Sequence, residues 1–157
     1  MLAISGDDPP REFRIFAAGT VETLKGTFVF DAAAADAVMA DYRARGVDLM
    51  IDYDHAALDA KPLDPALSGR AAGWFSLELR NGELWATNVR WTPPADAALR
   101  AKEWRFVSPA FSRDEENRIT SLQNIAITNM PATCRIEPLI AASAAEDLDR
   151  RLAPWLR

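Results

Sequence analysis

The sequence predicts an α+β protein, a small and mostly antiparallel β-barrel or curled sheet with two or three helices at its connections. Three observations predict this class. About six or seven runs of strand-forming residues follow one another, mostly as sequential hairpins. Asn81-Gly82 joins two of these runs, and Asp31 and Thr92 each stand where a helix can begin. Closure into a barrel is the usual way for such a meander to protect its edge strands.

The first part of the chain predicts two strands and a helix. The strands are "EFRIFAAG" over 12–19 and "KGTFVF" over 25–30. Asp31 then supplies the N-cap of a helix over 32–45, and Gly46 ends that helix in the left-handed C′ position.

The next strand, "VDLMIDYDH" over 47–55, leads into a loop. Alternation through residue 55 puts alternate side chains on opposite faces of the sheet. One face carries Leu49, Ile51, Tyr53 and His55, and the other carries Met50, Asp52 and Asp54. The stretch "AALDAKPLDPALSGR" over 56–70 contains two prolines and no clean period, so we expect a loop.

The clearest local signal is the hairpin over 73–91, "GWFSLELRNGELWATNVRW". Its centre, Asn81-Gly82, accepts the positive φ angles of a type I′ turn. Thr92 then caps a short helix over 93–103 that begins with two prolines.

Two more strands and a tail complete the chain. The strands "WRFVSPAFS" over 104–112 and "ITSLQNIAIT" over 119–128 are joined by a charged turn. The capping box "SAAE" over 143–146 predicts a further helix. We therefore expect a barrel domain over 1–142 and a helical tail over 143–157 that covers the core or docks a partner.

The composition narrows the function classes. The 157 residues are 49% hydrophobic and 26% charged, as in one ordinary globular domain. A net charge of −5 without a basic cluster argues against nucleic-acid binding. Neither a secretory signal nor a membrane span is visible, so we expect a cytosolic protein without membrane contact. With one cysteine, Cys134, and one histidine, His55, we expect no disulfide, metal or other cofactor.

His55 is the first candidate for chemistry. It ends a predicted strand beside a long loop, and a histidine pKa of about 6.5 suits a general base at neutral pH. A structural role, with the ring bound to a backbone carbonyl, is the alternative. Asp52 and Asp54 are its nearest carboxylates, but alternation directs both to the opposite face, where they would meet solvent or cap the loop.

Ser108 is the second candidate. It lies in "RFVSPAF", on the strand face that also carries Trp104, Phe106 and Ala110. Its hydroxyl is either bonded to the sheet or available as a nucleophile, and the strand pattern alone leaves both roles open.

The ordered set "IDYDH", "AAGWFSLEL", "GELWATNVRWT", "RFVSPAF" and "IAITNMPA" resembles the phage Mu I-protein family, the prohead proteases of Mu-like phages and prophages. The resemblance covers about 49–132. The chain also resembles, more distantly, the lambdoid prohead proteases and herpesvirus assemblin. These are serine peptidases in which the histidine precedes the serine in the sequence. The resemblance implies a β-barrel wrapped by helices, with the family's histidine at His55 and its serine at Ser108, 53 positions apart.

The third member of such a site stays open. Lambdoid relatives carry a glutamate where this chain has Asn124, and an amide orients a histidine but stabilises its charged form less. Asn124 fills the position, a dyad suffices, or a carboxylate from 56–70 takes part. Pro109 has no N–H with which to hold an oxyanion, so a loop amide, Arg113 or Arg135 is expected instead.

The resemblance implies a capsid-maturation serine endopeptidase that cleaves scaffold and major capsid proteins. It would act inside the assembling procapsid, in the cytoplasm of the bacterial host. The alternative is a catalytically inactive assembly or scaffold-docking module with the same fold. A homodimer formed through the tail from Ser143 is a further hypothesis.

Overall fold

A computed structural model describes residues 8–133 and residue 139. Its strands are β1 (Phe13–Phe16), β2 (Gly19–Thr23), β3 (Gly26–Phe30), β4 (Leu49–Tyr53), β5 (Gly73–Arg80), β6 (Glu83–Trp91), β7 (Phe106–Arg113) and β8 (Ile119–Thr128). Its helices are α1 (Ala32–Arg45), the short 3₁₀ helix η1 (Pro65–Leu67) and α2 (Pro93–Arg100). The predicted tail helix, the boundary between 142 and 143, and the predicted dimer surface lie outside the described residues.

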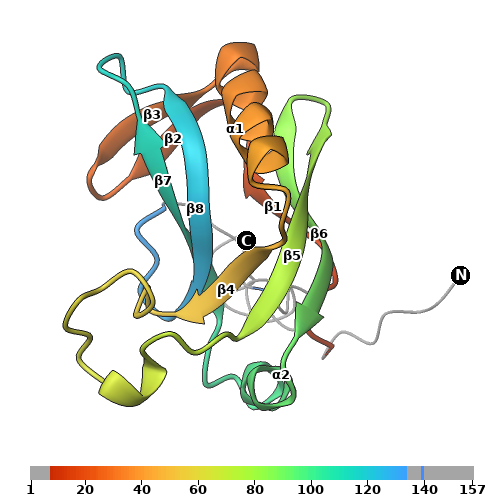
Figure 1. Cartoon of the computed structure of the whole chain (residues 1–157), viewed down its shortest axis with the longest axis vertical. Helices are drawn as coiled ribbons and strands as arrows, with labels where there is room; N and C mark the ends of the chain where they lie inside the picture. The colour runs from red at the N-terminus through yellow and green to blue at the C-terminus, as the bar shows by residue number, and fades with distance from the viewer. Residues whose placement is uncertain (1–7, 134–138, 140–157) are drawn as a thin grey trace, which may run out of the picture.

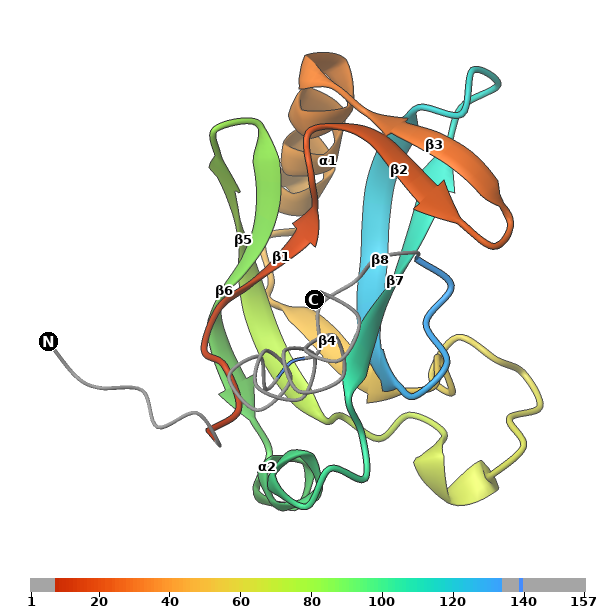
Figure 2. The same cartoon turned by 180° about the vertical axis from the view of Figure 1, so that it is seen from behind.

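Six strands form one mixed sheet in the order β1-β6-β5-β4-β8-β7, and β2 and β3 form a separate hairpin. The sheet curls so that its edge strands β1 and β7 lie on the same side of the molecule (Figures 1 and 2). The result is a nearly closed barrel, which confirms the predicted α+β class and barrel-like sheet.

The sheet departs from a simple meander in one important pair. β4 pairs with β8 in parallel, whereas the remaining pairs among the named strands are antiparallel. β4 therefore lies between β5 and β8, and the chain passes through β6, α2 and β7 before it returns beside β4. The two strands end at the same end of the barrel, near α2 and the loop between β4 and β5 (Figure 1).

Local signals account for the first helix and the central hairpin. The Asp31 side chain accepts a hydrogen bond from the Ala34 N–H at 2.9 Å, and Gly46 ends α1 with a φ of 64°. Asn81 and Gly82 have φ angles of 52° and 79°, as the predicted type I′ turn requires.

Two predictions about elements are wrong. α2 ends at Arg100 rather than at 103, because Lys102 adopts a left-handed φ of 59°. β2 occupies a stretch where we predicted no complete strand. Val21 is the only buried residue of β2, so the alternating pattern there is weak.

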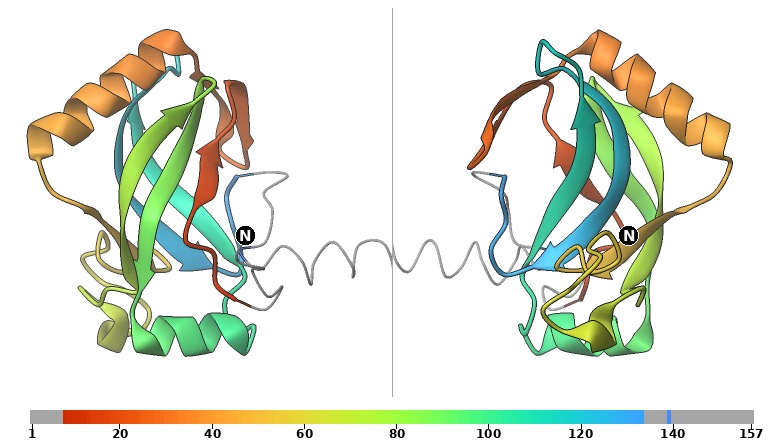
Figure 3. Two further views of the ribbon diagram at one scale, coloured as in Figure 1. Left: turned by 90° about the vertical axis from the view of Figure 1, so that its right-hand side faces the viewer. Right: turned by 60° about the vertical axis from the view of Figure 1, so that its left-hand side comes forward.

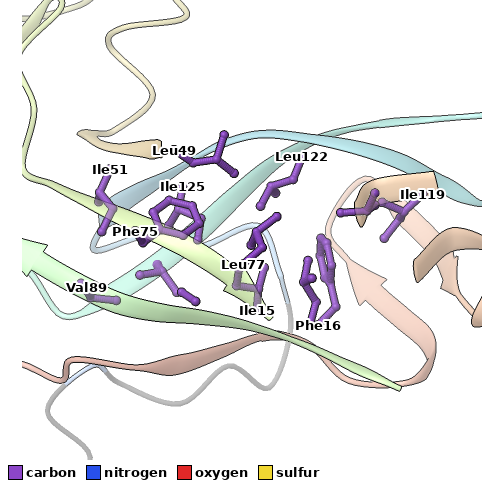
Figure 4. Close-up of a cluster of buried hydrophobic side chains, with 14 of the residues drawn as sticks. Ile15, Phe16, Leu49, Ile51, Phe75, Leu77, Val89, Ile119, Leu122 and Ile125 are labelled. Atoms are coloured by element: carbon purple, nitrogen blue, oxygen red, sulfur yellow. The ribbon is translucent and has the colours of Figure 1, made fainter. Parts of the chain in front are cut away.

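The core fills the space inside the curled sheet. Figure 4 shows aliphatic and aromatic side chains that meet there from several strands, among them Ile15, Leu49, Ile51, Phe75, Leu77 and Ile125. α1 crosses outside the sheet and packs on β8 through the buried face that includes Val38 and Met39 (Figure 3). None of the helices in the described ranges has the length and apolar character needed to cross a bilayer.

Candidate active site

The register of three neighbouring strands brings Ser108, Asp52 and Asn124 onto one face of the sheet. Asp52 of β4 and Ser108 of β7 both pair with Ala126, from opposite sides of β8. Paired residues project from the same face, and Asn124, two positions before Ala126, shares that face. Since neighbouring strands lie about 4.8 Å apart, the Cα atoms of Asp52 and Ser108 are separated by roughly 10 Å.

This polar face is buried although it lies opposite the barrel core. The exposed fraction is 0% for Asp52, 5% for Asn124 and 6% for Ser108. The predicted alternation of Ser108 with Phe106 and Ala110 is confirmed, because these residues pair with Ala126, Thr128 and Asn124 of one β8 face.

His55 lies in a tight turn and not on the strand. β4 ends at Tyr53, although the Asp54 N–H still donates to the carbonyl oxygen of Ile127 at 3.0 Å. The Ala56 N–H then donates to the Tyr53 carbonyl oxygen at 2.9 Å, and Asp54 and His55 have φ angles of 49° and 58°. Two successive left-handed residues have the pattern of a type I′ turn. The prediction that the strand runs through residue 55 is therefore wrong.

The same turn folds back toward the polar face. Asp52 Oδ2 accepts a hydrogen bond from the Ala57 N–H at 3.0 Å. Because the Asp52 side chain projects from the face that carries Ser108, the segment with His55 and Ala57 folds toward that face too. Of the two roles predicted for Asp52, the loop cap is confirmed by this hydrogen bond. The predicted contact with solvent is wrong, because Asp52 is fully buried.

Three buried polar atoms on this segment and this face lack partners. Asp52 Oδ1, His55 Nδ1 and Asn124 Oδ1 have no hydrogen-bond partner within the described ranges, and Trp85 Nε1 on β6 shares this property. Hydrogen bonds through these atoms therefore do not join Ser108, His55 and Asn124 in this structure. Buried side-chain polar atoms are rarely unpartnered, so three of them on the polar face and the turn that folds toward it mark a candidate functional site.

Of the two arginines predicted as oxyanion donors, the structure describes only Arg113. Arg113 is five positions beyond Ser108 on β7, which corresponds to roughly 17 Å at the rise of a strand. Its guanidinium donates to Asn117 Oδ1 at 2.9 Å, at the far end of the strand, so a role beside Ser108 is excluded. Arg135 lies outside the described residues. Pro109 fits β7 because an edge strand tolerates the missing N–H.

Sequence reasoning missed Asp52 as a member of the site. Alternation predicts a strand that continues through His55, whereas the turn breaks the alternation after Tyr53. A signal was present, because Asp and His are among the residues that most often adopt a positive φ, and "DH" directly follows Tyr53. In the described part of the chain, no three His, Cys, Asp or Glu residues are grouped to hold a metal ion.

Comparison with known proteins gives a consistent set of relatives. Residues 13–140 match the family described as Mu-like prophage I protein, N-terminal domain. The Mu-like prophage FluMu I protein of Haemophilus influenzae is 32% identical over 123 residues, which cover 73% of this chain and 34% of the relative. Protease I of Escherichia phage Mu is 29% identical over 124 residues, which cover 76% of this chain and 34% of the relative. The chain thus spans about a third of the length of these relatives. It has no significant match among solved structures.

Proposed function

Since the chain belongs to the family of Mu-like prophage I protein N-terminal domains, we propose that it is a serine endopeptidase of capsid maturation. One relative carries the name Protease I, which supports peptidase activity. The observation that carries the proposal is the sheet register: it puts Ser108 on the same face as Asp52, whose side chain binds the turn that contains His55.

His55 is the general base of the proposed reaction, because it is the only histidine in the chain. Its ring takes the proton from Ser108 Oγ as the oxygen attacks the scissile carbonyl carbon. The resulting imidazolium then protonates the leaving amine, and an acyl-enzyme remains on Ser108. Water activated by the same ring hydrolyses that ester and restores the free serine.

Asn124 belongs to the proposed site as a polar neighbour of Ser108. It lies on β8 between β4 and β7, and its unpartnered Oδ1 supports a role in binding a donor within the site. Ser108 is only 6% exposed, so little of its surface is open to a peptide in this structure.

The proposed substrates are the scaffold and major capsid proteins of the same phage or prophage. Cleavage would take place inside the assembling procapsid, in the bacterial cytoplasm, without a cofactor, nucleic acid or membrane. A protein substrate is consistent with the net charge of −5, since no polyanion has to be bound.

A second candidate function is an inactive assembly or scaffold-docking module with the same fold. The low exposure of Ser108 and the unpartnered His55 Nδ1 favour it, because an assembled catalytic pair would place the ring beside an accessible hydroxyl.

Co-expression with the scaffold and capsid proteins of the same prophage separates the two functions. We expect the parent chain to process them, and Ser108→Ala to lose at least about a thousand-fold in rate, because the nucleophile is gone. The matched control is Ser112→Ala, the same change four positions along β7, where the hydroxyl accepts a hydrogen bond from Gln123 Nε2 at 2.6 Å.

The readout is the fraction of cleaved substrate on a denaturing gel, with the cut identified by mass spectrometry. Processing by Ser108→Ala at the parent rate would exclude Ser108 as the nucleophile. A folded parent chain that binds these proteins without cutting them would favour the assembly module.

A further inference from the structure

We propose that Asp52 is the residue that orients His55. Its carboxylate Oδ1 accepts a hydrogen bond from the Nδ1–H of the ring and leaves Nε2 free to act on Ser108. The catalytic meaning of this arrangement rests on the proposed peptidase function. The arrangement itself can be tested without any substrate.

Asp52 is fully buried, and its two carboxylate oxygens differ in their hydrogen bonding. Its side chain is 0% exposed, and one carboxylate oxygen, Oδ2, accepts the Ala57 N–H at 3.0 Å. The other oxygen, Oδ1, is buried without a partner. A buried carboxylate oxygen without a donor is costly, so a nearby donor has a strong tendency to bind it.

His55 follows Asp52 closely in the chain, across a tight turn. The two residues are three positions apart, and the hydrogen bond from the Ala56 N–H to the Tyr53 carbonyl folds the segment between them into a tight turn. Asp52 itself holds the far side of that turn through Ala57. His55 Nδ1 is buried and unpartnered too, so a change of ring orientation can join a free donor to a free acceptor.

The carboxylate of Asp52 also suits the charge that develops on the ring. When Ser108 gives up its proton, the ring becomes an imidazolium, which a carboxylate stabilises more than the neutral amide of Asn124 does. The charged residues of the segments around the turn are Asp54, Asp59, Lys61, Asp64 and Arg70 in the loop and Lys102, Glu103 and Arg105 before β7. β8, which carries Asn124, contains no charged residue.

The test uses NMR of the imidazole, whose signals are unambiguous because His55 is the only histidine. When the ring of the parent chain is neutral, we expect its proton on Nδ1. The two ring ¹⁵N chemical shifts report this tautomer. We expect Asp52→Asn to weaken this preference and bring the two ring ¹⁵N chemical shifts closer together, because an amide oxygen accepts the Nδ1–H less strongly than a carboxylate does. The asparagine keeps an oxygen that can accept the Ala57 N–H.

The matched control is Asp54→Asn. It removes the same charge from the residue beside His55, but Asp54 is exposed, and asparagine tolerates its left-handed φ of 49°. We expect the two ring ¹⁵N chemical shifts of this variant to stay close to those of the parent, because solvent screens an exposed charge.

Several results would overturn the proposal. A parent ring with its proton on Nε2 would do so even if Asp52→Asn fails to fold. Equal ring ¹⁵N chemical shifts of His55 in Asp52→Asn and in the parent would also do so. A change of the ring tautomer in Asn124→Ala, without any change in Asp52→Asn, would also overturn the proposal. A parent chain that shows the expected tautomer, and its change in Asp52→Asn, but cleaves no substrate would instead refute the peptidase function and leave the orienting role of Asp52 in place.

Discussion

His55 adopts a backbone conformation that few side chains tolerate. Together with Asp54 it forms a pair of successive left-handed residues, at φ angles of 58° and 49°. Each such residue costs about 1–2 kcal/mol relative to the right-handed region, and Asp, Asn and His tolerate the region best. The strained turn connects the buried Asp52 to a ring whose Nδ1 has no hydrogen-bond partner. Strained backbone often occurs at functional sites.

This turn predicts an order of stability among variants of His55. We expect His55→Val to have a free energy of unfolding about 1–2 kcal/mol below that of His55→Asn, because a β-branched residue resists a positive φ. Urea denaturation at pH 7 measures both. Since both variants lack the ring, the difference reports on the backbone and not on the base. Equal stabilities would show that the turn does not hold residue 55 in the left-handed region.

Single residues of the site were predictable to different degrees. His55 and Ser108 could be selected because the chain has one histidine and because "RFVSPAF" carries a serine within an otherwise strand-like run. Asp52 was harder to select, because its position relative to His55 depends on where β4 ends. A one-residue change in that boundary reverses the face to which the following side chain is assigned.

At the scale of elements, local signals set the start of α1 well. The Ala34 N–H lowers the pKa of the Asp31 carboxyl below its usual value near 3.8, and the guanidinium of Arg118 lowers it further. Arg118 Nε donates to Asp31 Oδ2 at 3.1 Å, so the cap also binds α1 to the segment before β8. The cap was visible in the sequence, whereas its partner 87 positions away was not.

The cap predicts a specific pH dependence. A carboxyl whose pKa is lower in the folded chain stabilises the fold fully above its unfolded pKa, and that contribution is lost as the pH falls through the folded pKa. We therefore expect the parent to exceed Asp31→Asn in stability at pH 7 and the difference to shrink below about pH 4. Asparagine is a good N-cap, so the variant removes the charge and keeps the cap.

The measurement is the denaturation midpoint of both proteins from pH 7 to pH 2 at one ionic strength. Because Glu12 and Asp48 also have lowered pKa values, through Arg80 and Arg90 respectively, only the difference between parent and variant reports on Asp31. A difference that stays constant over this range would contradict the role given to the Asp31 charge.

At the scale of the whole molecule, the parallel pairing of β4 with β8 determines the site. It makes Ala126 the common partner of Asp52 and Ser108 and thereby joins segments 56 positions apart. Hairpin signals predict antiparallel neighbours, but no local pattern specifies which distant strand completes a sheet. One hint exists in β4, where four of five residues are buried, as is typical of a strand covered on both faces.

The central claim is that His55 activates Ser108 across these strands. Its most direct test is labelling with a small fluorophosphonate, followed by mass spectrometry of the intact protein and its peptides. The account predicts one adduct, on Ser108, in the parent chain and in Ser112→Ala, and none in His55→Asn. An adduct on another residue, no adduct in the parent, or equal labelling of Ser108 in His55→Asn would contradict it.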